Sequence, residues 1–137
     1  MSVAVVTSDS PEGREALVRG VEESRLRGQE LIALAVVDAK SVSEEDREAT
    51  RLATEQILTS RGLADAQFSI RVEPDAGDPA GAIVDLAAEI GATLLVIGSR
   101  RRSAVGKFLM GSTVQRVLLD SPVPVLVVKA PEERSTR

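Results

Sequence analysis

The chain of 137 residues is short enough for one domain and long enough to bury a core without a metal or disulfide staple. It contains no cysteine and no histidine, which excludes disulfides, zinc–thiolate sites and serine–histidine catalysis. A net charge of −4 disfavours binding to the phosphate backbone of nucleic acid, and the absence of tryptophan and tyrosine disfavours single-stranded nucleic acid, whose recognition usually needs stacking side chains.

The first third of the chain predicts a strand, a helix and a second strand. Val3–Thr7 is a β-rich run, and Ser10 followed by Pro11 predicts the N-cap and first residue of a helix. The helical pattern continues to about Arg27. The apolar run Leu31–Val37 then predicts a strand that is covered on both faces.

The middle of the chain predicts a second helix and a strand near a sheet edge. The helix is expected to begin after Ser43, with acidic residues in its first turn, and to end at Gly62. Its buried stripe is expected to consist of Leu52, Ala53, Ile57 and Leu58. Apolar and polar residues alternate over Phe68–Val72, which predicts a half-exposed strand.

The last third predicts two helices and two strands. Asp78 is expected to cap a helix that closes at Gly91, and Thr93–Ile97 predicts a buried strand. A further helix is expected to begin at Gly111–Ser112 and to end near Asp120, with Val114, Val117 and Leu118 on its apolar face. Val125–Val128 predicts the last strand, at the sheet edge or at a strand start, because two prolines precede it.

This alternation predicts one α/β domain over residues 1–129, a three-layer doubly wound parallel sheet of five strands. Residues 130–137 form a polar stretch, which we expect to be an unstructured tail. Ligands of such sheets bind beyond the carboxyl ends of the strands, where the strand order reverses. The loops after the first and fourth strands are therefore the places to look for a site.

The segment from Gly98 to Thr113, GSRRRSAVGKFLMGST, links the fourth strand to the next helix. It carries four positive charges and no negative one. Backbone N–H groups and the helix dipole favour an anion at such a position. Dinucleotide and P-loop fingerprints are both absent. The alternative interpretation is an ordinary strand exit and helix cap with a solvated basic loop.

The spacing within this segment resembles that of the nucleotide-binding branch of the universal stress protein family. The family pattern G-x2-G-x9-G-[ST] matches Gly98, Arg101, Gly111 and Ser112, with arginine in place of the second glycine. Other stretches that resemble the family are Leu34–Val37, Gly77–Pro79 and Pro122–Val128, and the resemblance covers residues 3–129. It implies an adenine-nucleotide α-hydrolase-like fold with strand order 3-2-1-4-5.

The resemblance also implies a binding site for ATP or another adenine nucleotide, which Mg²⁺ could accompany. The matching contact residues are Ser8, Asp9, Val36, Ile97, Gly98, Arg101, Gly111, Ser112 and Thr113. Two of them depart from the family pattern. Arg101 either clamps the phosphates or blocks their site, and Ser8 stands where the family has an aspartate, with Asp9 one residue later.

We therefore expect a cytoplasmic stress-response protein that binds an adenine nucleotide and acts as a nucleotide-responsive interaction module. Catalysis is expected to be at most slow ATP hydrolysis, because no histidine is available as a base. The alternative is a dimeric interaction protein of the same family in which Arg101 fills the phosphate site. The resemblance implies a homodimer through the last strand, formed by Val125, Leu126, Val127 and Val128, and an unknown protein partner. Neither nucleic acid nor a membrane is expected as a partner.

Overall fold

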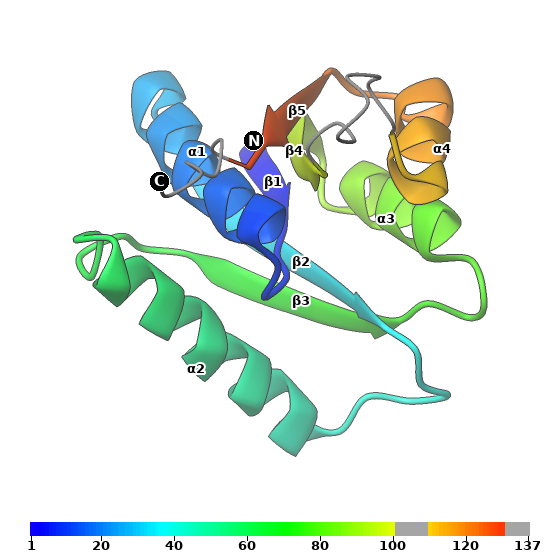
Figure 1. Ribbon diagram of the computed structural model, residues 1–137, viewed down its shortest axis with the longest axis horizontal. Helices are drawn as coiled ribbons and strands as arrows, with labels where there is room; N and C mark the ends of the chain where they lie inside the picture. Colours follow the sequence, from blue (N-terminus) through cyan, green and yellow to red (C-terminus); the bar gives the residue numbers. More distant parts are fainter. Residues whose placement is uncertain (101–109, 131–137) are drawn as a thin grey trace, which may run out of the picture.

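The computed structural model describes residues 1–100 and 110–130, in which strands and helices alternate strictly (Figure 1). In chain order they are β1 (Ser2–Val6), α1 (Pro11–Arg27), β2 (Glu30–Val37), α2 (Glu44–Ser60), β3 (Ser69–Pro74), α3 (Pro79–Glu89), β4 (Ala92–Ser99), α4 (Ser112–Asp120) and β5 (Val125–Lys129). Residues 131–137, most of the expected tail, lie outside the described ranges.

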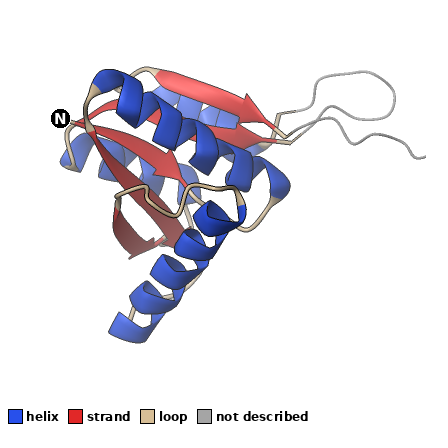
Figure 2. Ribbon diagram, turned by 90° about the vertical axis from the view of Figure 1, so that its left-hand side faces the viewer, coloured by secondary structure: helices blue, strands red, loops and turns tan. Residues whose placement is uncertain are grey.

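The strands form one five-stranded, all-parallel sheet of order β3-β2-β1-β4-β5. Helices α1 and α2 lie on one side of it, and α3 and α4 lie on the other (Figure 1). Figure 2 shows the twisted sheet with helices against both faces. The expected doubly wound fold and its strand order are confirmed. The order reverses between β1 and β4, so their carboxyl ends are the switch point.

The sheet separates two hydrophobic clusters because side chains alternate along each strand. Val5 and Val96 point toward α1, where they pack with Leu17, whereas Ala4 and Leu95 belong to the cluster under α3 and α4. All five residues are fully buried. The central strand β1 and its neighbour β4 are thus covered on both faces, which explains their continuous apolar sequences.

The expected buried stripe of α2 is partly wrong. Leu52 is 46% exposed and Ala53 is also exposed, while Thr54 and Leu58 are buried. The helix is rotated so that its inner face is centred on Thr54, whose hydroxyl donates to the carbonyl of Thr50 at 2.8 Å. A threonine can occupy this position because the preceding turn satisfies its only polar group.

Both edges of the sheet agree with the expectations. The half-exposed strand β3 forms one edge, and β5 forms the other, next to β4. Pro122 and Pro124 precede β5, where a missing N–H disturbs no central ladder. Within residues 1–100 and 110–130, every helix is too short or too polar to cross a lipid bilayer.

Candidate functional site

The candidate site is a cavity of about 450 Å³ at the carboxyl end of β4, where α4 begins. We call it the α4 cavity. Its walls come from the end of β4, the start of α4 and the first turn of α1. The lining residues are Glu12, Gly98, Arg100, Met110, Gly111, Ser112, Thr113 and Val114. Four of the sequence-predicted residues, Gly98, Gly111, Ser112 and Thr113, therefore share one cavity at the switch point.

The amino end of α4 differs from those of the other helices in the described part of the chain. Ser10, Ser43 and Asp78 cap α1, α2 and α3 by accepting hydrogen bonds from backbone N–H groups. The N-cap of α4 is Gly111, which makes no side-chain cap. The first N–H groups of a helix have no partner within the helix, so those of α4 can be donated to an anion in the cavity.

Two of the motif glycines have different structural roles. A Cβ atom on Gly98 would lie 2.3 Å from the carbonyl oxygen of Glu12, so glycine is needed there for α1 to pack against β4. Gly111 has φ −64° and ψ 156°, which any residue can adopt. A Cβ on Gly111 would meet no described atom within 4 Å. Packing therefore explains Gly98, whereas open space at Gly111 suits close approach of a ligand to the backbone.

An ion pair at the surface joins α4 to the start of α3. The Arg116 guanidinium contacts the Asp78 carboxylate at 3.2 Å and the Asp120 carboxylate at 3.4 Å. Asp78 also accepts a hydrogen bond from the Gly81 N–H at the start of α3. The Gly81 N–H, with a further contribution from Arg116, lowers the pKa of Asp78. Arg116 thus joins the helix that begins at the cavity to the N-cap of its neighbour.

The structure places Ser8 and Asp9 outside the lining of the α4 cavity. The Ser8 hydroxyl is 2.8 Å from that of Ser10, in the turn that leads into α1. The Asp9 side chain is 95% exposed, and its carboxylate pairs with Arg14 at 3.0 Å. Both residues follow β1 and so lie at the correct edge of the sheet, but the Asp9 carboxylate is engaged with Arg14 in the first turns of α1.

Val36 and Ile97 lie on the face of the sheet that α3 and α4 cover, and neither lines the α4 cavity. Ile97 is 4% exposed and belongs to the core. Val36, like Val6 on the adjacent strand β1, is only partly buried. These two valines leave apolar surface near the carboxyl ends of β1 and β2. Arg101, the substituted motif position, lies outside the described residues.

Sequence reasoning did not select Glu12, Arg100, Met110 or Val114 as site residues. Arg100 and Met110 are the described residues on either side of the basic loop, and both line the cavity. From local sequence, Glu12 is only an acidic residue in the first turn of α1, where it complements the helix dipole. Its place in the cavity follows from the adjacency of β1 and β4, which no local pattern indicates.

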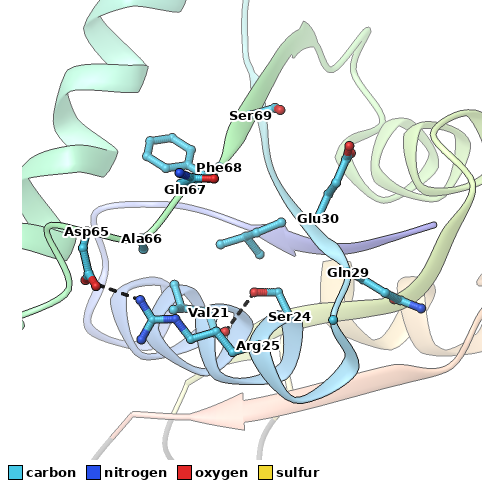
Figure 3. Close-up of a pocket in the computed structure, with 12 residues that line it drawn as sticks. Val21, Ser24, Arg25, Gln29, Glu30, Asp65, Ala66, Gln67, Phe68 and Ser69 are labelled. Atoms are coloured by element: carbon cyan, nitrogen blue, oxygen red, sulfur yellow. Dashed lines mark hydrogen bonds and ion pairs between the residues drawn. The ribbon is translucent and has the colours of Figure 1, made fainter.

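A second cavity, of about 510 Å³, lies at the opposite end of the sheet, between the end of α1 and the starts of β2 and β3 (Figure 3). Arg25 points toward Asp65 across its wall, with the two charged groups 3.4 Å apart. The Ser24 hydroxyl donates to the Val21 carbonyl at 2.9 Å, so it is already satisfied. Parallel sheets bind ligands at the carboxyl ends of their strands, which favours the α4 cavity as the functional site.

Comparison with known proteins gives the family. The chain matches the model of the Universal stress protein family over residues 1–129. It is 36% identical to a universal stress protein from Mycolicibacterium smegmatis over 133 residues, which cover 93% of this chain and 96% of the relative.

Solved structures of universal stress proteins share the fold. One from Archaeoglobus fulgidus superposes with a TM-score of 0.75 at 28% identity, over 94% of this chain and 98% of that one. A universal stress protein from the same organism, in complex with dAMP, superposes with a TM-score of 0.70 at 25% identity and the same coverage. The chain belongs to the universal stress protein family.

Proposed function

We propose that the protein binds an adenine nucleotide, with ATP as the principal ligand, across the carboxyl ends of β1 and β4. The phosphates lie in the α4 cavity against the N–H groups of Gly111, Ser112 and Thr113. Bound nucleotide then acts as a signal that changes how the protein interacts with a partner in a stress response.

The uncapped amino end of α4 carries this proposal. It opens into a cavity, its N-cap is a glycine at which a Cβ would meet no described atom within 4 Å, and Arg100 lines the same cavity with a positive charge. The partly buried Val6 and Val36 supply apolar surface for the base on the adjacent strands. The related structure with dAMP supports an adenine nucleotide as the ligand class.

Calorimetric titration of the purified protein with ATP, ADP, AMP and cyclic AMP tests the proposal. We expect saturable binding of at least one of them in the micromolar range, and adenine nucleotide in an acid extract of freshly purified protein. Absence of heat and of thermal stabilisation with all four nucleotides would refute nucleotide binding. It would favour the alternative in which Arg101 occupies the phosphate site.

Arg101→Gly separates the two roles open to this arginine. If Arg101 clamps phosphate, the glycine variant binds ATP more weakly, because a charge-assisted hydrogen bond is lost. If Arg101 blocks the site, the same variant binds ATP more tightly. The variant restores the glycine of the family pattern. It therefore also measures how the natural arginine at this position changes the affinity for ATP.

We further propose that the protein forms a homodimer through β5. This strand is an edge of the sheet, and its residues Val125, Leu126 and Val127 are only partly buried. Unpaired edge strands with apolar side chains favour pairing with a second chain. Leu126→Lys should give a monomer in sedimentation velocity. Leu119→Lys on α4, where Leu119 is 83% exposed, is the matched control and should remain dimeric. A dimeric Leu126→Lys protein would rule this interface out.

A further inference from the structure

Met110 brings an oxidisable sulfur atom to the candidate site. The chain has no cysteine and two methionines, Met1 and Met110, so sulfur oxidation can occur only at these two thioethers. Met1 is 87% exposed and precedes β1, at the opposite edge of the sheet from the site. Met110 is partly exposed and lines the α4 cavity. A small oxidant can therefore approach it from solvent.

The same methionine anchors the start of α4. It directly precedes the N-cap Gly111, and its side chain packs against the hydrophobic cluster under α3 and α4. Its carbonyl accepts a hydrogen bond from the Gln115 side-chain amide at 3.2 Å. An apolar residue just before an N-cap commonly fixes the direction in which the chain enters a helix. Because Gly111 makes no side-chain cap, the packing of Met110 matters more here than it would beside a capped helix.

Oxidation would change this anchor chemically. Hydrogen peroxide transfers one oxygen atom to the thioether: the O–O bond breaks, an S–O bond forms, the sulfur loses two electrons, and water is the reduced product. The resulting sulfoxide is polar, and a polar oxygen without a hydrogen-bond partner is unfavourable in an apolar cluster. The oxidised Met110 side chain should therefore leave the cluster, and the chain at the start of α4 should move with it.

We propose that Met110 is an oxidation site through which peroxide lowers the affinity of the α4 cavity for nucleotide. The inference rests on the proposed nucleotide function and adds regulation by oxidants to it. The N–H groups of Gly111, Ser112 and Thr113 directly follow Met110 in the chain. Displacement of the Met110 side chain therefore misaligns the donors proposed to bind phosphate. Oxidation of Met1, at the other edge of the sheet, leaves these donors in place.

Treatment of the intact protein with hydrogen peroxide, followed by peptide mass spectrometry and calorimetric titration with ATP, tests the inference. We expect sulfoxide at Met110, and ATP binding about tenfold weaker than in the untreated protein, equivalent to about 1.4 kcal/mol. Met110→Leu is the matched control, because leucine is apolar, similar in size and inert to peroxide. It keeps Met1, and its affinity for ATP should not change on treatment. Met110→Gln introduces a polar side chain without peroxide and should bind ATP as weakly as the oxidised wild type.

The outcomes separate this inference from the proposed function. If Met110 stays unoxidised while Met1 is oxidised, or if Met110 sulfoxide leaves the affinity for ATP unchanged, the inference is wrong and nucleotide binding stands. The inference is also wrong if peroxide weakens ATP binding equally in Met110→Leu, or if a urea melt shows that the oxidised wild type is unfolded, because the effect is then not local to α4. If the untreated protein binds no nucleotide, both the proposed function and the inference fail.

Discussion

Replacing Gly111 with valine should separate nucleotide binding from folding. The backbone angles of Gly111 suit valine, and a Cβ there meets no described atom within 4 Å. The loss of a favourable N-cap costs a few tenths to about 1 kcal/mol, and the smaller entropy of the unfolded chain offsets about 0.4–1 kcal/mol. The free energy of unfolding should change by less than about 0.5 kcal/mol, and the Tm by roughly 2 °C or less.

The same valine should strongly weaken nucleotide binding, because its methyl groups occupy the space through which phosphate reaches the backbone. Hydrogen bonds to a charged group contribute about 1.5–3 kcal/mol each, so losing one weakens ATP binding by roughly 10- to 150-fold. Calorimetric titration and a urea melt on the same preparation measure both effects. Wild-type affinity in Gly111→Val would refute phosphate binding at the start of α4.

Gly98→Ala is the complementary variant, because it should lower the stability of the fold, which Gly111→Val should leave nearly unchanged. Its Cβ would lie 2.3 Å from the Glu12 carbonyl oxygen and 2.5 Å from the Glu12 carbonyl carbon, so the backbone of α1 must move. Overpacking of this kind costs about 1–3 kcal/mol, and the urea midpoint should fall accordingly. A Gly98→Ala protein as stable as the wild type would contradict the close packing of α1 against β4 at Gly98.

Three further substitutions test local features of the fold. Ala76 has a φ of 52°, so Ala76→Gly should raise the free energy of unfolding by about 0.5–1 kcal/mol, and a lower urea midpoint would contradict this. Asp78→Ala should lower stability at neutral pH. Because folding lowers the pKa of Asp78 from 3.8, its contribution is present above that pH and is lost as pH falls through the folded-state pKa, so the two proteins should converge in acid melts. Ser99 is 1% exposed and its hydroxyl has no partner among the described residues; Ser99→Ala should stabilise by about 1 kcal/mol, and destabilisation would reveal a hydrogen bond.

Most of the fold could be predicted from local sequence signals. The N-caps Ser10, Ser43 and Asp78 each begin a helix in the structure, and the alternation of apolar runs with helical patterns predicted the parallel sheet. The order of the strands could not be predicted in this way, because no local pattern indicates which strands are neighbours. The predicted order came from the resemblance to the universal stress protein family, and the structure confirms that order.

The error in α2 has a physical cause. Leu52 and Ala53 are apolar, but burial is decided by which side of the helix meets the sheet. That helix has few apolar residues, so its pattern is compatible with more than one rotation. Thr54 is buried because its hydroxyl bonds to the preceding turn, a compensation that hydrophobicity does not register.

Only part of the site could be predicted, because local spacing does not show which distant segments come together. Gly98, Gly111, Ser112 and Thr113 are close in sequence on either side of one loop, so their spacing could indicate a shared cavity. Glu12 comes from a segment more than eighty residues earlier, and only the pairing of β1 with β4 brings it there. The contacts proposed for Ser8, Asp9, Val36 and Ile97 stay predictions until a nucleotide complex tests them.

Arg100 and Met110, the described residues on either side of residues 101–109, both line the α4 cavity. Their separation is set by the packing of α4 against β4 and α3. A substitution that shifts α4 should therefore change the shape of the α4 cavity without contacting it.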